Sequence, residues 1–506
     1  MILFMTPVYR RALQDKLLLL AAVFAIVWAV IRACVQSITM DEANTYFWFV
    51  ATSNVWYPFS NNHILNTLLM WITTHAFGTS IITIRAPALL GAILYVGVCH
   101  FLCRNITDRF SIQLPVFICL IYNPFIFDYM VAARGYGLAN AFLLAAIAVP
   151  VWHRVKSRPS VRQSCALASL ALGLSFSANY SFAFADLATF LAITAWAICH
   201  RGTESVVRTV GFCALPGLLV ALLMCGYPML HWWGYDYGIG AHSLKEMRQS
   251  LVQSSLYRLD PRFQGTAWYK AMSFLRPLLL PVFLILCFCR IVSAWLDGSW
   301  LQDKRARWLG RFGAALAGIV TLCVLMHWLA FRFYRLPLPL GRAGIFLLPL
   351  CTLLGGVIVA APARSLIAQW LRRGLTAVSL CLALYFLLCL RLSYFKEYQW
   401  DADAKQVYSV LARYNHTYGV TDVGMFDLSA FALNYYRALS KAETFPEFKP
   451  EPPNPPADKL VYVMSRVNQR SFIDKEKLVI VYRGKFSDTV IAVKPGGPIP
   501  PTTVNP

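Results

Sequence analysis

Two adjacent carboxylates, Asp41 and Glu42, follow the first long apolar stretch of the 506-residue chain. Carboxylates at a membrane surface are costly unless they are solvated or take part in function. If the segment is helical, adjacent side chains diverge by about 100°, so the two carboxylates do not form a symmetric pair that shares one proton. One of them can face a groove while the other orients a neighbouring group or a cation. The alternative is a solvated pair that caps a helix.

A second polar group, Asn61-Asn62-His63, lies about twenty residues further along the same loop, after the aromatic segment 56–59. Amides bond to hydroxyl groups, and aromatic rings stack on the faces of sugars. The loop thus combines acid, amide, imidazole and aromatic groups, a mixture that is typical of a sugar site. The alternative is a polar turn that caps a helix at the membrane interface.

A third candidate is Arg134, which lies in the sequence ARGYG between two apolar stretches that almost touch. Gly135 and Gly137 allow a tight turn and the close approach of a ligand. The guanidinium can then hold an anionic headgroup. The alternative is an arginine that reaches the membrane interface without binding a ligand.

Three further arginines, Arg332, Arg335 and Arg342, lie in a short turn that is rich in aromatic residues and prolines. Membrane topology does not place arginines at an outer face, so an anion is the natural partner of this group. We expect the three side chains to contact a phosphate. Anchoring at the interface is the alternative, and it is compatible with that role.

Membrane-spanning helices must position all these residues. The chain is 58% hydrophobic and only 14% charged, whereas about a quarter of the residues of an ordinary soluble domain are charged. A span needs about 20 apolar residues. The pattern predicts about eleven transmembrane helices, near residues 17–36, 84–103, 111–130, 136–152, 163–178, 180–199, 209–229, 272–292, 312–331, 343–361 and 373–391.

The distribution of charge gives the orientation. The formal net charge is +22, but the basic residues cluster in short loops between apolar stretches, which indicates membrane topology and no nucleic-acid partner. The loop 37–83 contains no Lys or Arg, so we place it outside and the N-terminus in the cytoplasm. An odd number of spans then puts the C-terminal segment outside, in the periplasm if the chain sits in a bacterial inner membrane. The apolar stretch Ile64–Phe77 is short, and we expect it to lie flat at the interface.

The segment after the last predicted span differs in pattern. Two helices are predicted, at Asp403–Tyr414 and Leu428–Leu439, and β-branched runs predict strands at 460–464, 478–482 and 490–493. This pattern indicates a small α/β domain. We therefore expect a transmembrane catalytic domain at 1–391, an extracytoplasmic α/β domain at 392–494 and a disordered tail at 495–506.

An outward acid, outward arginines and many spans together favour one chemical task. An anionic lipid is held at the outer leaflet while a polar acceptor approaches from water. A carboxylate can take the proton of the acceptor hydroxyl as it attacks. Arginines, or a bound divalent cation, can stabilise the charge that develops on the leaving phosphate.

Five short motifs also carry a resemblance to a known family. The chain resembles the GT-C superfamily of membrane glycosyltransferases, in the branch of protein mannosyltransferases and aminoarabinose transferases. The motifs follow the family order across the membrane part: DEANTY at Asp41–Tyr46, NNHILN at Asn61–Asn66, RAPALLGA at Arg85–Ala92, ARGYGL at Ala133–Leu138 and GRAGIFLLP at Gly341–Pro349. The GT-C fold implies interfacial helices in the first outer loop, as expected for Ile64–Phe77.

The resemblance implies inverting transfer of a sugar from a polyprenyl-phosphate donor to an extracytoplasmic lipid, glycan or protein. It makes Asp41 the catalytic base and gives Glu42 a supporting role. Arg134 and the arginines near Tyr334 would contact the lipid phosphate. The other residues expected to bind substrate are Tyr46, Asn61, Asn62, His63 and Tyr136. The sugar, the acceptor and the use of a divalent cation stay open.

Two other functions are compatible with a chain of this kind. One is a flippase or other transporter of lipid-linked sugars, which would place charged residues near the middle of the bilayer and often shows inverted repeats. The charged motifs here lie at one face, and no repeat is evident. The other is a polysaccharide polymerase or ligase, which uses pyrophosphate-linked donors.

Overall fold

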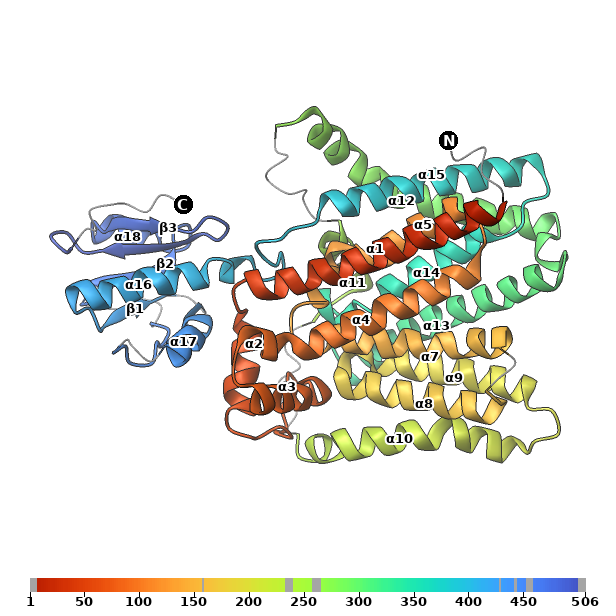
Figure 1. Ribbon diagram of the computed structural model, residues 1–506, viewed down its shortest axis with the longest axis horizontal. Coiled ribbons are helices and arrows are strands. Elements are labelled where there is room, and N and C mark those ends of the chain that lie inside the picture. The colour runs from red at the N-terminus through yellow and green to blue at the C-terminus, as the bar shows by residue number, and fades with distance from the viewer. Residues whose placement is uncertain are drawn as a thin grey trace. The chain divides into compact units, whose positions relative to one another are not determined.

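Long apolar helices make up most of the computed structural model (Figure 1). The structure describes residues 7–156, 159–232, 240–256, 265–426, 429–440, 444–451 and 458–498. Within these ranges, eight helices are long and apolar enough to cross a membrane. They are α1 (Pro7–Val35), α4 (Ile81–Ile106), α7 (Tyr136–Lys156), α9 (Ala183–His200, after the 3-10 turn η3, Tyr180–Phe182), α10 (Val206–Leu230), α12 (Ala267–Leu296), α13 (Lys304–Tyr334) and α15 (Leu366–Leu388). The prediction of a polytopic helical membrane protein is confirmed.

Three of the eleven expected spans are shorter or more polar than predicted. The span expected at 111–130 is two helices, α5 (Phe110–Ile121) and α6 (Pro124–Tyr129). The chain breaks at Asn123, whose side chain accepts a hydrogen bond from the N–H of Phe125 at 3.0 Å. Pro124 then begins the new helix, a position where its missing N–H costs nothing.

The other two differences concern α8 (Val161–Ala178) and α14 (Leu347–Ala360). Serines and Arg162 make α8 more polar than the apolar stretches within the eight long helices. At 14 residues, α14 is roughly 21 Å long, which is shorter than the hydrocarbon core of a bilayer. The remaining short helices and turns are α2 (Met40–Thr45), η2 (Tyr46–Val50), α3 (Ile64–Phe77), α11 (Leu244–Ser255), η5 (Ser299–Leu301), η6 (Gly341–Gly344) and η7 (Gln399–Asp401).

The chain folds as two compact units. The first contains Met1–Val30, Trp56–Leu69 and Ala86–Leu390, and the second contains Ile31–Val55, Met70–Arg85 and Arg391–Pro506. The segment between α1 and α4 therefore contributes to both units. Asp41 and Glu42 fold with the C-terminal segment, whereas Asn61, Asn62 and His63 fold with the helical bundle. The helix predicted at Ile64–Phe77 is present as α3 with the expected bounds, and its place at a membrane interface stays a prediction.

In the first unit, α7, α8, α9 and α10 lie side by side (Figure 1). Small residues bring the backbones of α8 and α10 together. A Cβ atom on Gly173 would lie 2.4 Å from the carbonyl oxygen of Gly217, and the N–H of Gly217 donates to the hydroxyl of Ser169 at 2.8 Å. Close approach through small residues is typical of helices that pack within a membrane.

In the second unit, the C-terminal segment forms a four-stranded sheet in the order β1-β2-β4-β3. Its strands are β1 (Val423–Met425), β2 (Val461–Ser465), β3 (Val479–Arg483) and β4 (Thr489–Val493), and its helices are α16 (Ala404–Tyr418), α17 (Ser429–Leu439) and α18 (Arg470–Lys475). β1 is parallel to β2, and the other neighbours are antiparallel. The two predicted helices and three predicted strands are confirmed, while β1 and α18 were not expected.

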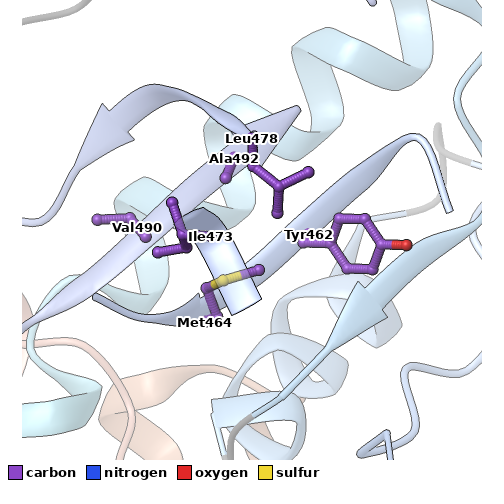
Figure 2. Close-up of a cluster of buried hydrophobic side chains, with 6 residues drawn as sticks. All are labelled: Tyr462, Met464, Ile473, Leu478, Val490 and Ala492. Carbon is purple, nitrogen blue, oxygen red and sulfur yellow. The ribbon is translucent and has the colours of Figure 1, made fainter. Parts of the chain in front are cut away.

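The sheet has a small apolar core (Figure 2). Alternate residues of β2 and β4 point to one face, where Ile473 of α18 and Leu478, which directly precedes β3, meet them. The cluster consists of Tyr462, Met464, Ile473, Leu478, Val490 and Ala492. The tail expected to begin at residue 495 lies outside the described residues from Ile499 onward.

Candidate active site

The carboxylate pair lies at the start of α2, and local hydrogen bonds explain why the helix begins there. The N–H of Glu42 donates to Thr39 Oγ1 at 3.2 Å, and Glu42 Oε2 accepts from the N–H of Thr39 at 2.9 Å. This reciprocal pair is a capping box. Glu42 thus takes part in capping α2 together with Thr39, and neither carboxylate is solvated, since Asp41 and Glu42 are only 4% and 0% exposed.

Arg85, at the start of α4, neutralises the buried Glu42. Its Nε donates to Glu42 Oε1 at 2.9 Å, and its Nη2 donates to Oε2 at 2.8 Å. The remaining guanidinium hydrogens donate to backbone carbonyl oxygens near the end of α1, those of Ala33, Gln36 and Ser37, at 2.7–3.0 Å. All five N–H donors of this side chain are thus satisfied, and Arg85 joins the end of α1 to α2.

An aromatic ring covers the ion pair. Arg85 Cζ lies 5.1 Å from the ring centroid of Phe395, and Arg32 Cζ lies 5.3 Å from the same centroid. Cation–π contacts of this length are favourable, and more so when water is excluded. Phe395 belongs to the segment that follows α15, so this segment shields the carboxylate pair from solvent.

The same segment provides the partner of Asp41. The hydroxyl of Tyr398 donates to Asp41 Oδ2 at 2.8 Å, and both side chains are buried. Three residues further on, Asp401 Oδ2 accepts from the N–H of Met40 at 2.7 Å. The two carboxylates of the pair therefore have different environments: a guanidinium holds Glu42, and a phenol bonds to Asp41.

Tyrosines of η2 and α17 complete the surroundings. The hydroxyl of Tyr46 lies 3.0 Å from Thr79 Oγ1, and its ring meets Tyr435 edge-on at 6.1 Å. The hydroxyl of Tyr436 accepts from the N–H of Ile38 at 3.0 Å. Burial raises the pKa of Tyr435 and of Tyr436 above the usual range, so both phenols stay protonated at neutral pH.

In the first unit, the structure brings Asn61 and Arg134 together. Arg134 Nη2 donates to Asn61 Oδ1, and the Arg134 side chain is buried. Two amides fix the backbone of its turn: Asn66 Nδ2 donates to the carbonyl oxygen of Ala133 at 2.9 Å, and Asn179 Nδ2 donates to that of Arg134 at 3.5 Å. The NNHILN and ARGYGL segments therefore form one polar site.

His63 and Asn62 differ in their surroundings. The ring of His63 lies 5.6 Å from the ring of Tyr136, which in turn lies 4.8 Å from that of Tyr129. Asn62 Nδ2 donates to the carbonyl oxygen of Tyr57 at 3.0 Å, and its Oδ1 accepts from Thr67 at 2.8 Å. Asn62 thus stabilises the turn before α3, as the capping alternative expected.

Gly135 is required by the turn that presents Arg134. Its φ is +73°, and a Cβ atom there would lie 2.1 Å from the carbonyl oxygen of Ala178. We expect Gly135→Ala to destabilise the protein by about 1–3 kcal/mol for the backbone conformation and by about 1–3 kcal/mol more for the overlap. Thermal unfolding in detergent measures the loss. Gly202→Ala is the control, because Gly202 has a φ of +62° with nothing within 4 Å of its Cβ position; equal losses in both variants would disprove the overlap.

The other predicted arginines lie around the end of α13. Arg332 and Arg335 are exposed, and Arg335 ends the helix with a φ of 55°. Arg342 is half-buried in η6. The structure places these three residues and Arg134 in the first unit, and Asp41 in the second. From the sequence we expect Asp41 and these arginines to line one outward cavity, and this expectation stays a prediction.

A divalent cation was considered for this site. Across the residues that the structure describes, no three His, Cys, Asp or Glu side chains come together as a metal-binding group. Both oxygens of Glu42 accept from Arg85, and Asp401 accepts from the backbone. Both oxygens of Glu42 are thus occupied by Arg85, and the use of a divalent cation stays an untested expectation.

Two residues of the site had no predicted role, Arg85 and Tyr398. Arg85 stood in the sequence only as the first residue of the RAPALLGA motif. The argument used for Arg332, Arg335 and Arg342, that topology does not place arginines at an outer face, also applies to Arg85, which closely follows the loop 37–83. Tyr398 gave no such signal, because it lies 357 residues from Asp41 in an unremarkable segment.

Comparison with known proteins gives matches among solved structures. No family model matches the chain, and no curated protein matches it. Among solved structures, ArnT from Cupriavidus metallidurans in the apo state is similar, with a TM-score of 0.45 and 12% identity over 95% of this chain and 98% of that chain. The same protein bound to undecaprenyl phosphate has equal values over 94% of this chain and 97% of that chain. At this TM-score and identity, the likeness assigns no activity, ligand or residue role to this protein.

Proposed function

We propose that the protein is an inverting glycosyltransferase that moves a sugar from a polyprenyl-phosphate donor to an extracytoplasmic acceptor. The observation that supports this most is the difference between the two buried carboxylates. Arg85 binds both oxygens of Glu42, whereas Asp41 accepts a hydrogen bond from the hydroxyl of Tyr398. A carboxylate paired with a guanidinium resists protonation, so Asp41 is the group better suited to take a proton.

The proposed transfer step can be written in full with side chains of this protein. The acceptor oxygen attacks the anomeric carbon from the side opposite the phosphate, and the proton of the acceptor hydroxyl passes to Asp41. The bond between the anomeric carbon and the phosphate oxygen breaks, and its electron pair stays on the phosphate. The configuration at the anomeric carbon inverts. In this proposal, Arg134 and the group Arg332, Arg335 and Arg342 stabilise the charge on the leaving polyprenyl phosphate.

The remaining predicted substrate residues belong to the same proposal. Asn61, next to Arg134, and His63, next to Tyr136, are assigned to the donor sugar and its phosphate. Asp41 is nearly enclosed here, and a base must come within about 2.6–3.2 Å of the proton it takes. Binding of the acceptor therefore has to open a path to Asp41, with Tyr46 at its edge.

The location is also a proposal. Charge asymmetry between the loops supports a multi-pass protein of a bacterial inner membrane with a cytoplasmic N-terminus. The C-terminal segment and the carboxylate pair would then face the periplasm, where lipid-linked sugars are available and nucleotide sugars are not.

A direct assay tests the proposed reaction. The purified full-length protein, in liposomes, is given a panel of polyprenyl-phosphate hexoses and pentoses together with a membrane extract as the source of acceptor. Release of polyprenyl monophosphate with loss of the sugar from the donor supports the proposal. Movement of an intact donor across sealed vesicles would favour a flippase, and turnover of pyrophosphate-linked donors alone would favour a polymerase or ligase; either result contradicts it.

The hydrogen bond that Tyr398 donates to Asp41 leads to a prediction of a moderate change in kcat and in the pH–rate profile. Its hydroxyl stabilises the ionised form of Asp41, and a hydrogen bond to a charged group is worth about 1.5–3 kcal/mol. We expect Tyr398→Phe to lower kcat about tenfold and to move the acid limb of the pH–rate profile to higher pH, because Asp41 is then protonated more easily. Tyr418→Phe, at an exposed residue of α16, should leave the profile unchanged. An unaltered acid limb in Tyr398→Phe would rule out this role.

A further inference from the structure

Five basic side chains from four helices of the first unit line one cavity of about 580 Å³. They are Arg11 of α1, Arg104 of α4, Arg154 and Lys156 of α7, and Arg305 of α13. Membrane topology accounts for basic residues at this end of the helices. It does not account for their convergence on one cavity.

Carboxylates neutralise only part of this charge. Asp108, the one acid among the described residues of the cavity wall, binds Arg305 and also lies 3.5 Å from Arg11 Nη2. Arg104 binds Asp15 at 2.8 Å. In the described part of the chain, Arg154 and Lys156 have no carboxylate partner. Two carboxylates thus face five cations, and the cavity keeps a positive charge that suits an anion.

An apolar groove of about 850 Å³ begins at the same place. It runs between α7, α9 and α13 and is lined mainly by apolar side chains such as Ile147, Ile193 and Leu316. Arg154 lines both the groove and the basic cavity. Its Cζ lies 4.2 Å from the ring centroid of Trp308, a cation–π contact that holds the guanidinium where the two spaces meet.

We propose that the basic cavity and the groove together bind one anionic phospholipid. Its phosphate lies among Arg154, Lys156 and Arg305, and an acyl chain follows the groove between the helices. Basic pockets between transmembrane helices at the cytoplasmic side are a known way to bind anionic headgroups. A free phosphate ester shares the chemistry of the headgroup, but only a lipid also fills the apolar groove.

This lipid site is separate from the candidate active site. α7 has 21 residues between Tyr136, beside His63, and Lys156 in the basic cavity, which corresponds to roughly 30 Å along a helix. A binding measurement can therefore test the lipid site whether or not the proposed transfer reaction is correct.

Native mass spectrometry of the purified full-length protein tests the site. The probes are dioleoyl phosphatidylglycerol, dioleoyl phosphatidylcholine with the same chains, and inorganic phosphate. We expect the protein to prefer phosphatidylglycerol over phosphatidylcholine by at least tenfold. Each arginine near a lipid phosphate contributes about fivefold, so Arg154→Gln combined with Arg305→Gln should weaken phosphatidylglycerol binding by about 25-fold.

Two matched variants complete the test. Arg307→Gln removes the same charge at the same end of α13 from an exposed residue outside the cavity wall, and it should bind as the wild type does. Ala315→Phe fills the groove and should weaken lipid binding while all the arginines remain. The proposal would be overturned if the two lipids bound equally, or if equimolar inorganic phosphate displaced the lipid. It would also be overturned if Arg307→Gln lost as much lipid binding as the double variant, or if Ala315→Phe bound lipid fully.

Discussion

Asp41→Asn is expected to reduce sugar transfer by about 10²–10⁴-fold, the usual contribution of a general base. The amide has the shape of the carboxylate, so its oxygen can still accept from the hydroxyl of Tyr398, which lies 2.8 Å from Asp41 Oδ2. It cannot take a proton from the acceptor at neutral pH. The variant should therefore fold and reach the membrane in normal amounts while turnover of the donor is lost.

Asp488→Asn is the matched control for this result. Asp488 also accepts hydrogen bonds, from Ser465 Oγ at 2.9 Å and from the N–H of Val467 at 2.7 Å, but it lies in the C-terminal sheet region and has no proposed role in transfer. Its turnover should match that of the wild type. Normal turnover in Asp41→Asn would remove Asp41 as the base and, with it, the main support for the proposed mechanism.

The second large effect is expected at the buried ion pair. Arg85→Met should lower the free energy of unfolding by about 3–5 kcal/mol, because it leaves a buried charge without its partner. Glu42 would lose both guanidinium hydrogen bonds, and the carbonyl oxygens of Ala33, Gln36 and Ser37 would lose theirs. Chemical unfolding in mixed micelles measures the change.

A double variant separates the charge from the packing. Arg85→Met combined with Glu42→Gln removes both charges, so it should be more stable than Arg85→Met alone. Arg470→Met serves as control, since the Arg470–Asp474 pair is exposed and surface pairs contribute about 0–1 kcal/mol. If the double variant were less stable than Arg85→Met, the isolated charge of Glu42 would not be the cause of the loss.

Hydropathy alone predicted the fold class, because lipid imposes one strong requirement, a long apolar helix for every crossing. It was less accurate where a helix is buried by other helices. α5 and α14 are as apolar as the long helices but shorter. For α5, composition does not show that the chain restarts at Asn123 and Pro124. β1 was missed because three residues, Val423–Met425, are too few for a recognisable alternation.

The individual residues of the candidate site were predictable from the sequence, but the contacts between them were not. Asp41, Asn61 and Arg134 stand out because polar and charged groups are rare next to apolar stretches. That the guanidinium of Arg134 meets Asn61, or that of Arg85 meets Glu42, depends on how distant segments pack. Tyr398 shows the limit most clearly, since no spacing rule connects residues separated by 357 positions.

The partners of the carboxylate pair also set an order of assembly during synthesis. Arg85 follows Glu42 by 43 residues. At the usual speed of translation, Arg85 is therefore synthesised roughly 2–9 s after Glu42. Tyr398 follows Asp41 by 357 residues and emerges about 20–70 s later, after α15, the last of the eight helices that could cross a membrane within the described ranges. A ribosome that stalls within the membrane part thus leaves Asp41 without the segment that encloses it. Such an unfinished chain would present an open acidic site to the quality-control proteases of the membrane, and only the completed chain would hide it.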